Sequence, residues 1–136
     1  MTTDSNESNA ASRRTLTIAA ALITVATALG AFGTHALQPI LSPQRFANYS
    51  IAVNYQFFNA LGLLGVGLAQ RLLDSAWLRW SIRLLLLGVL LFCGSVYAIS
   101  FGLPSWIATA APLGGTSLMV AWIIFAIAMW RGRRLA

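Results

Sequence analysis

His35 and Cys93 are the single histidine and the single cysteine of this 136-residue chain, and each lies in an apolar run. His35 belongs to the segment "GAFGTHAL", whereas Cys93 lies in a different run. No Asp or Glu occurs within any of these runs, so neither side chain has a neighbouring carboxylate in sequence. A metal site needs several ligands, and acid–base catalysis needs a positioned donor and acceptor. The sequence therefore predicts no catalytic residue, no metal site, no cofactor and no enzyme activity.

The composition points to a membrane protein. Hydrophobic residues make up 58% of the chain, charged residues make up 9%, and the mean hydropathy is +0.74. A soluble domain carries about a quarter charged residues, so this chain cannot cover itself with a polar surface. The nine basic residues are all arginines, and they flank the apolar runs instead of forming one patch. We therefore expect the lipid bilayer as a partner and no nucleic acid.

Four runs are long enough to cross a bilayer, which takes about 20 apolar residues. None shows the short alternating pattern of a membrane barrel strand. The prediction is an all-α, four-helix transmembrane bundle within a membrane domain of residues 15–130. Its spans are residues 15–37, 50–70, 82–102 and 112–130.

The segments outside the spans are polar. Residues 1–14 contain no core-forming run and are predicted to be a disordered cytoplasmic tail, and residues 131–136 a basic cytoplasmic tail. Ser42 followed by Pro43 is typical of a helix start, with serine as the N-cap and proline at the first helical position. The second helix is therefore expected to begin at Pro43, before the apolar part of its run.

The distribution of arginines predicts the direction of threading. With four spans, both termini and the middle loop lie on one side, and that side holds every arginine except Arg45. Positive charge is retained on the cytoplasmic side. We therefore expect a multi-pass protein of the cell membrane with both termini in the cytoplasm.

With this direction, the polar residues of the spans gather in one layer toward the outer side. The candidate residues of this layer are His35, Tyr55, Gln56, Asn59, Ser95 and Tyr97. On a helical projection His35 shares a face of small and polar residues with Ala20, Thr24, Thr27, Ala31 and Thr34. Such faces of membrane helices point toward other helices. We therefore expect His35 to face the bundle and to bond Asn59 or Gln56. Whether the layer only fixes packing or also binds something stays open.

Small residues in the spans are expected to let helices approach closely. Gly30 and Gly33 lie beside His35, and Gly94 is in the third span. Pro112, Gly114 and Gly115 are expected at the start of the fourth span, where flexible backbone suits the turn and free backbone N–H groups suit an anion.

Four motifs, one in each helix, resemble a known family. They are "GAFGTHAL", "YQFFNALGLL", "CGSVYAIS" and "PLGGTSLMVAW". In this order they resemble the small inner-membrane proteins of the YgdD and YwdK type, catalogued as domain of unknown function 423, with eukaryotic relatives called transmembrane protein 256. The resemblance spans residues 15 to 130 and implies a four-span membrane protein without an established activity. The residues that match its motifs are Gly30, Gly33, His35, Tyr97, Pro112, Gly114, Gly115 and Trp122.

One position departs from the family pattern. Asn59 stands where the family usually has histidine, so ligation of haem or metal by two histidines is not available to this chain. By elimination we expect a non-catalytic accessory or assembly protein that binds lipid, a membrane-protein partner or a second copy of itself. The alternative is a small transporter or channel that uses the polar layer around His35.

Overall fold

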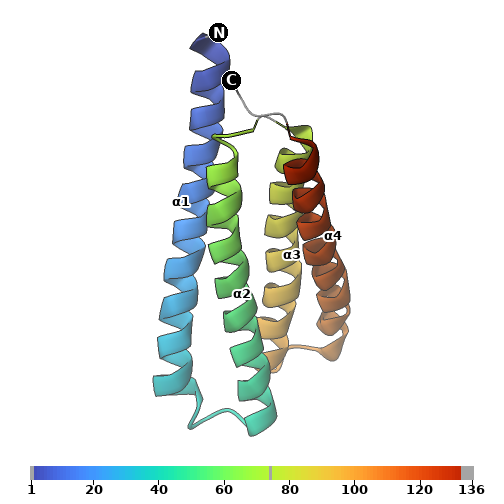
Figure 1. Cartoon of the computed structure of the whole chain (residues 1–136). Helices are drawn as coiled ribbons and strands as arrows, with labels where there is room; N and C mark the ends of the chain where they lie inside the picture. Colours follow the sequence, from blue (N-terminus) through green and yellow to red (C-terminus); the bar gives the residue numbers. More distant parts are fainter. Residues whose placement is uncertain (1, 74, 133–136) are drawn as a thin grey trace.

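The structure, a computed structural model, describes residues 2–73 and 75–132 and is helical throughout, with no strand in these ranges. Figure 1 shows the long helices side by side. Two short helices join them: the π-helix η1 follows the first long helix, and the 3-10 helix η2 precedes the last. The long helices are α1 (Thr2–Phe32), α2 (Pro43–Ala69), α3 (Ala76–Ser100) and α4 (Ala110–Arg131), and the short ones are η1 (Gly33–Leu37) and η2 (Ser105–Thr109).

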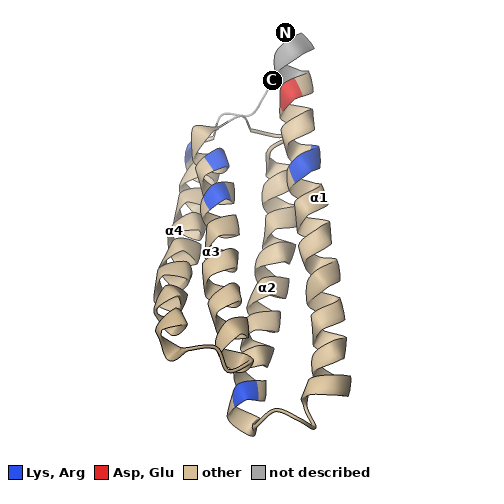
Figure 2. Cartoon of the chain, turned by 180° about the vertical axis from the view of Figure 1, so that it is seen from behind, with Lys and Arg blue, Asp and Glu red and all other residues tan. Residues whose placement is uncertain are grey.

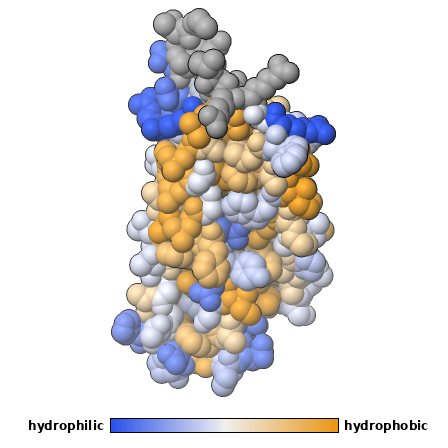
Figure 3. Space-filling model, in the orientation of Figure 1, coloured by the Kyte–Doolittle hydropathy of each residue, from blue (hydrophilic) through white to orange (hydrophobic). Residues whose placement is uncertain are grey.

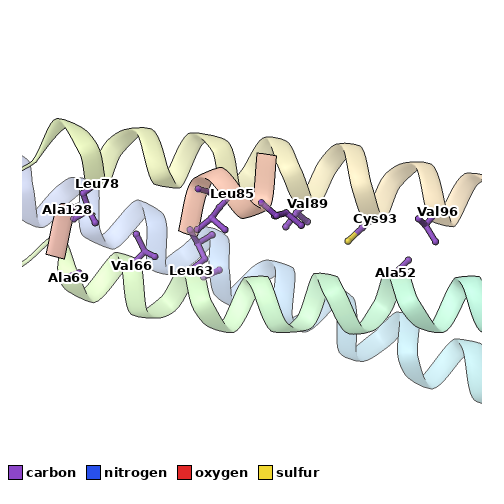
Figure 4. Packing of buried hydrophobic residues seen from close by; sticks show 13 residues of the cluster. Ala52, Leu63, Val66, Ala69, Leu78, Leu85, Val89, Cys93, Val96 and Ala128 are labelled. Carbon is purple, nitrogen blue, oxygen red and sulfur yellow. The ribbon is translucent and has the colours of Figure 1, made fainter. Parts of the chain in front are cut away.

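The helices follow one another in space in the order of the sequence. α1 packs on α2, α2 on α3, and α3 on α4, and the last of these contacts is the most extensive. The buried apolar cluster includes residues of all four long helices, and within it Leu63 and Val66 of α2 lie across from Leu85 and Val89 of α3 (Figure 4). Because α4 is held mainly by α3, its other side is left beside α2 without close packing.

All four helices are long and apolar enough to cross a membrane, as the sequence predicts. Large apolar side chains such as Val25, Leu90 and Ile123 are exposed. In Figure 3 apolar surface dominates the middle of the molecule and hydrophilic surface gathers toward its ends. In the part of the chain that is described, every arginine but Arg45 lies toward the end that holds the N-terminus (Figure 2).

The start of α2 is confirmed. Ser42 is extended, its hydroxyl accepts a hydrogen bond of 3.4 Å from the Arg45 backbone N–H, and Pro43 is the first helical residue. Serine satisfies one of the donors that every helix start leaves unpaired, and proline has no N–H to lose there.

The prediction of a disordered tail over residues 1–14 is wrong for the residues described, because α1 begins at Thr2. The tail is held by its serines. Ser8 donates a hydrogen bond of 2.8 Å to the Gln70 backbone carbonyl, and Ser12, fully buried, donates one of 2.7 Å to the Gly67 carbonyl. Polar side chains thus dock this part of the helix on the end of α2, where no apolar run signals an element. Of the predicted basic tail, residues 133–136 lie outside the described residues.

Side chains also fix the register of α1 against α2. The Tyr49 hydroxyl donates to the Leu29 carbonyl over 2.6 Å, near one end of the pair, and Ser12 bonds Gly67 near the other. The residue numbers of these pairs add up to 78 and 79. The two helices are antiparallel, so the residue of α1 that lies beside a given residue of α2 has a number close to 78 minus that residue's number.

The two helical hairpins are offset along their length. The rings of Tyr49 and Phe101 lie edge to face with centroids 5.9 Å apart, so the end of α3 lies beside Tyr49. α2 begins at Pro43, six residues earlier, which is about 9 Å at 1.5 Å per residue. The α1–α2 hairpin thus projects beyond the α3–α4 hairpin, as Figure 1 shows at the end away from the termini.

Candidate functional site

The structure separates His35 from the polar residues it was expected to contact. His35 is exposed in η1, and its side chain makes no hydrogen bond with any described residue. By the register of the hairpin it lies level with Pro43, sixteen residues from Asn59 and therefore about 24 Å away along α2. The expected bond to Asn59 or Gln56 is therefore wrong. The cause is the register of α1 against α2, which sets His35 beside the start of α2, whereas Gln56 and Asn59 lie near the middle of that helix.

The face of α1 that packs inward also differs from the prediction. The face that carries Ala20, Thr24 and Thr27 is exposed, whereas Ala19 and Ala26 are buried against α2. The threonine hydroxyls donate to carbonyls one turn earlier in their own helix, over 2.9 Å in both cases. A threonine that is satisfied in this way needs no partner helix, so this face can meet lipid.

Gly33 does serve close approach, as the sequence suggested for "GAFGTHAL". A Cβ atom at Gly33 would collide with the ring of Tyr49, and Tyr49 is 1% exposed. The glycine therefore admits the ring whose hydroxyl bonds Leu29. Gly30 is a looser contact, with a Cβ position 3.5 Å from Val53.

Gln56 joins three helices. Its Nε2 donates a hydrogen bond of 3.0 Å to the Leu22 carbonyl of α1, and its Oε1 accepts one of 2.9 Å from the Tyr97 hydroxyl of α3. Gln56 is 5% exposed, so both ends of a buried amide are paired. The sequence singled out Gln56 and Tyr97, and the structure brings them together.

Asn59 makes the corresponding link to α4. Its Oδ1 accepts a hydrogen bond of 3.1 Å from the indole Nε1 of Trp122, and its Nδ2 donates to the Tyr55 carbonyl over 2.9 Å. A Cβ at Gly62 would overlap the Trp122 ring, so this glycine makes the approach possible. The sequence marked Trp122 only through the family motif and did not pair it with Asn59.

The other candidates of the polar layer do not take part in these links. Tyr55 is half exposed, with its ring 4.8 Å from that of Phe92 between centroids. Ser95 is buried, but its hydroxyl donates within α3, to the Phe92 carbonyl. Gly94 is exposed and a Cβ there would meet no atom within 4 Å, so its expected packing role is not observed.

The "PLGG" segment lies in the first turns of α4. Pro112 is in the first turn, where proline is tolerated. Gly114 is buried against the backbone of Phe92, so that α3 and α4 meet closely, as expected. Gly115 has room, because the nearest atom to its Cβ position is in the Phe92 ring, 3.8 Å away.

A groove runs between α2 and α4, where the two helices do not pack closely. We call it the α2–α4 groove. Its volume is about 690 Å³, and the Asn59–Trp122 bond lies in its wall. Figure 3 shows small hydrophilic areas in the middle of an apolar face. The groove is lined by Tyr55, Phe58, Asn59, Phe92, Gly115, Leu118, Met119 and Trp122.

Sequence reasoning missed part of this groove. It passed over Phe58, Phe92, Leu118 and Met119 as ordinary apolar residues of membrane helices. Phe58 belongs to the motif "YQFFNALGLL", and Leu118 and Met119 belong to "PLGGTSLMVAW". Membership of these motifs was the one sequence signal that could have pointed to the three residues. Tyr49 helps to set the register of α1 against α2, but nothing in the sequence pointed to this residue.

Apolar helices that are tied together by buried amide, phenol and indole groups define a helical integral membrane protein. In the described chain no three His, Cys, Asp or Glu side chains come together as a metal site would require. The family model described as protein of unknown function (DUF423) matches residues 29–115, and the chain belongs to this family.

Relatives of known sequence agree with this assignment. A membrane protein named UPF0382 from Haemophilus influenzae is 35% identical over 108 residues, covering 79% of this chain and 86% of the relative. The UPF0382 inner membrane protein YgdD of Escherichia coli K12 is 34% identical, covering 79% and 82%. A UPF0382 membrane protein of Staphylococcus epidermidis is 32% identical over 104 residues, covering 76% and 84%. No solved structure matches the chain.

Proposed function

We propose that this protein is a non-catalytic accessory protein of the inner membrane that holds a hydrocarbon chain of a lipid in the α2–α4 groove. The groove itself is the observation that carries the proposal. It lies between two helices able to cross the bilayer, and aromatic, leucine and methionine side chains form most of its wall. Such walls suit a flexible apolar chain, since methionine and aromatic rings adapt to irregular shapes.

The polar atoms of the groove favour an apolar occupant. The amide oxygen and nitrogen of Asn59 and the indole N–H of Trp122 each already have a partner, either the other side chain or a backbone carbonyl. A polar solute would have to compete with these bonds in a medium without water, where unpaired groups are costly. The alternative of a transporter or channel built on His35 gains no support, because His35 lies apart from Gln56 and Asn59.

Substitution at Gly115 tests the proposal. Gly115→Leu places a branched side chain at the groove, where the Cβ position is 3.8 Å from the Phe92 ring, an ordinary contact distance. The matched control is Gly94→Leu, at an exposed glycine with open space around it. Lipids that remain bound after mild detergent extraction are counted by native mass spectrometry, and thermal unfolding is recorded for each variant.

We expect Gly115→Leu to retain fewer lipids than the wild type and Gly94→Leu to retain as many, with both variants unfolding near the wild-type temperature. Equal adducts in all three proteins would overturn the proposal. If Gly115→Leu instead loses a co-purifying protein while its lipids are unchanged, the occupant of the groove is a partner helix or a second copy of this chain and not a lipid chain.

We further propose that both termini lie in the cytoplasm. The support is the gathering of arginines toward the end of the molecule that holds the N-terminus, with Arg45 alone at the other end of the described chain. A reporter that works only in the cytoplasm should be active after Ala136, and one that works only outside should be active near Gln38. The reverse pattern would refute the orientation.

A further inference from the structure

A second pocket, separate from the α2–α4 groove, lies where α1, the end of α2 and the start of α3 meet. Its volume is about 470 Å³, and we call it the Gln70 pocket. Most of its polar lining comes from Glu7, Ser8, Gln70, Ser75 and Arg79. Glu7 and Ser8 precede residues 29–115, which the family model matches, so this pocket includes a part of the chain that the family does not define.

Gln70 has an unmet hydrogen-bonding need. The side chain is 8% exposed, and its Oε1 is the one buried side-chain oxygen or nitrogen without a partner among the described residues. Neighbouring hydroxyls do not supply a donor, because Ser8 gives its proton to the Gln70 backbone carbonyl and Ser12 gives its own to Gly67. The last torsion of glutamine is broad, so the amide oxygen can turn toward a donor that enters the pocket.

The two sides of the pocket carry opposite electrostatic character. Glu7 and the negative end of the α2 dipole favour a cation. Arg79 and the start of α3 favour an anion. Ser75, the N-cap residue of α3, makes no side-chain capping bond, so its hydroxyl does not occupy the N–H groups of that turn.

The neighbouring residues place the pocket at the level of lipid headgroups. Trp77 and Trp80, in the first turns of α3, are about half exposed, and tryptophan gathers at membrane interfaces. Ala11, Leu73 and Leu78 complete the wall, so the pocket also has an apolar side.

We propose that the Gln70 pocket binds the headgroup of a phospholipid that carries a primary ammonium group, as phosphatidylethanolamine does. The ammonium donates to Gln70 Oε1 and to the Glu7 carboxylate. The phosphate accepts from Arg79 and from the first N–H groups of α3. A choline headgroup has no N–H to donate, and a glycerol headgroup has no cation for Glu7.

The experiment measures lipid preference of the full chain by native mass spectrometry, with ethanolamine, choline and glycerol phospholipids of identical acyl chains offered in equal amounts. The wild type should retain the ethanolamine lipid about tenfold over the choline lipid, which corresponds to one charge-assisted hydrogen bond. Glu7→Gln and Gln70→Leu should each remove most of that preference. Arg14→Gln, a charge change at an exposed residue of α1 that does not line the pocket, should leave it intact.

Other outcomes overturn the proposal. Equal retention of ethanolamine and choline lipids by the wild type, or an unchanged preference in Glu7→Gln, would remove the ammonium site. Retention of the glycerol lipid as strongly as the ethanolamine lipid would assign the pocket to hydroxyl donors instead. Release of the ethanolamine lipid by millimolar O-phosphoethanolamine would identify a soluble headgroup compound as the ligand in place of a lipid.

Discussion

The indole N–H of Trp122 on α4 donates a 3.1 Å hydrogen bond to the side-chain oxygen of Asn59 on α2. The two helices are not neighbours in the packing order, so this bond, which lies in the wall of the groove, links them directly. Asn59 is 8% exposed and uses its amide nitrogen on the Tyr55 carbonyl. The bond therefore holds one wall of the groove against the other.

Trp122→Phe removes this donor and leaves the Asn59 oxygen buried without a partner. We expect the free energy of unfolding to fall by about 1–3 kcal/mol, the range for an unsatisfied buried polar group. Unfolding in detergent measures the loss. Trp106→Phe, at an exposed tryptophan in η2, serves as the control and should change little. If Asn59→Ala and Trp122→Phe have additive effects, the two residues do not act through one bond.

Gly62→Ala adds a methyl group where the Trp122 ring lies. Because the ring has to move, we expect a loss of about 1–3 kcal/mol in the free energy of unfolding. Gly94→Ala, in open space on a helix, should instead stabilise the protein by up to about 1 kcal/mol through helix propensity. In a Trp122→Leu background the cost of Gly62→Ala should shrink, and an unchanged cost would show that another neighbour is responsible.

Ser12→Ala tests the docking of the first turns of α1. The substitution leaves the Gly67 carbonyl without its side-chain donor and removes the acceptor for the Arg71 Nε, 3.3 Å away. A loss of about 1.4 kcal/mol corresponds to tenfold more frequent opening, so trypsin should cut at Arg13 and Arg14 about ten times faster. Thr17→Ala removes only a bond within α1 and should leave the cleavage rate near that of the wild type.

His35→Ala and Tyr49→Phe distinguish the two polar residues near η1. The His35 side chain is exposed and makes no hydrogen bond to described residues, so we expect its loss to change the free energy of unfolding by no more than about 0.5 kcal/mol. Tyr49 is buried and its hydroxyl bonds Leu29, so its loss should cost about 1–3 kcal/mol. Thermal unfolding of the two variants in the same detergent makes the comparison. The reverse order of stabilities would mean that His35, not Tyr49, holds η1 in place.

Much of the fold could be predicted from sequence, because it depends on local signals. Apolar length indicated four helices, and Ser42 with Pro43 indicated where α2 begins. The inward face of α1 was harder to predict. The face with Ala20 is apolar enough to meet lipid, and the face with Ala19 is apolar enough to meet the core, so either could point inward. In a soluble protein, water would have distinguished the two faces. Here a threonine satisfied within its own helix is compatible with either side.

The candidate site was predicted in part. Gln56 and Tyr97 were identified, since an amide and a phenol inside apolar runs must find partners. The depth of His35 was not predicted correctly. Span limits that are inferred from the length of the apolar runs place all helix ends in one plane, which the structure does not. The actual depth depends on the register set by Tyr49 and Ser12, side chains whose partners are backbone carbonyls. Backbone acceptors occur at every residue, so no sequence pattern singles them out.

The offset of the two hairpins gives the molecule a stepped profile at the end away from its termini. The step of about 9 Å approaches a third of the 30 Å hydrocarbon thickness of a bilayer. A large water-soluble molecule that arrives at this end meets the loop between α1 and α2 first, where Ile40 is 74% exposed. The α3–α4 hairpin ends lower, so a flat surface that rests on the α1–α2 loop stays clear of the end of that second hairpin.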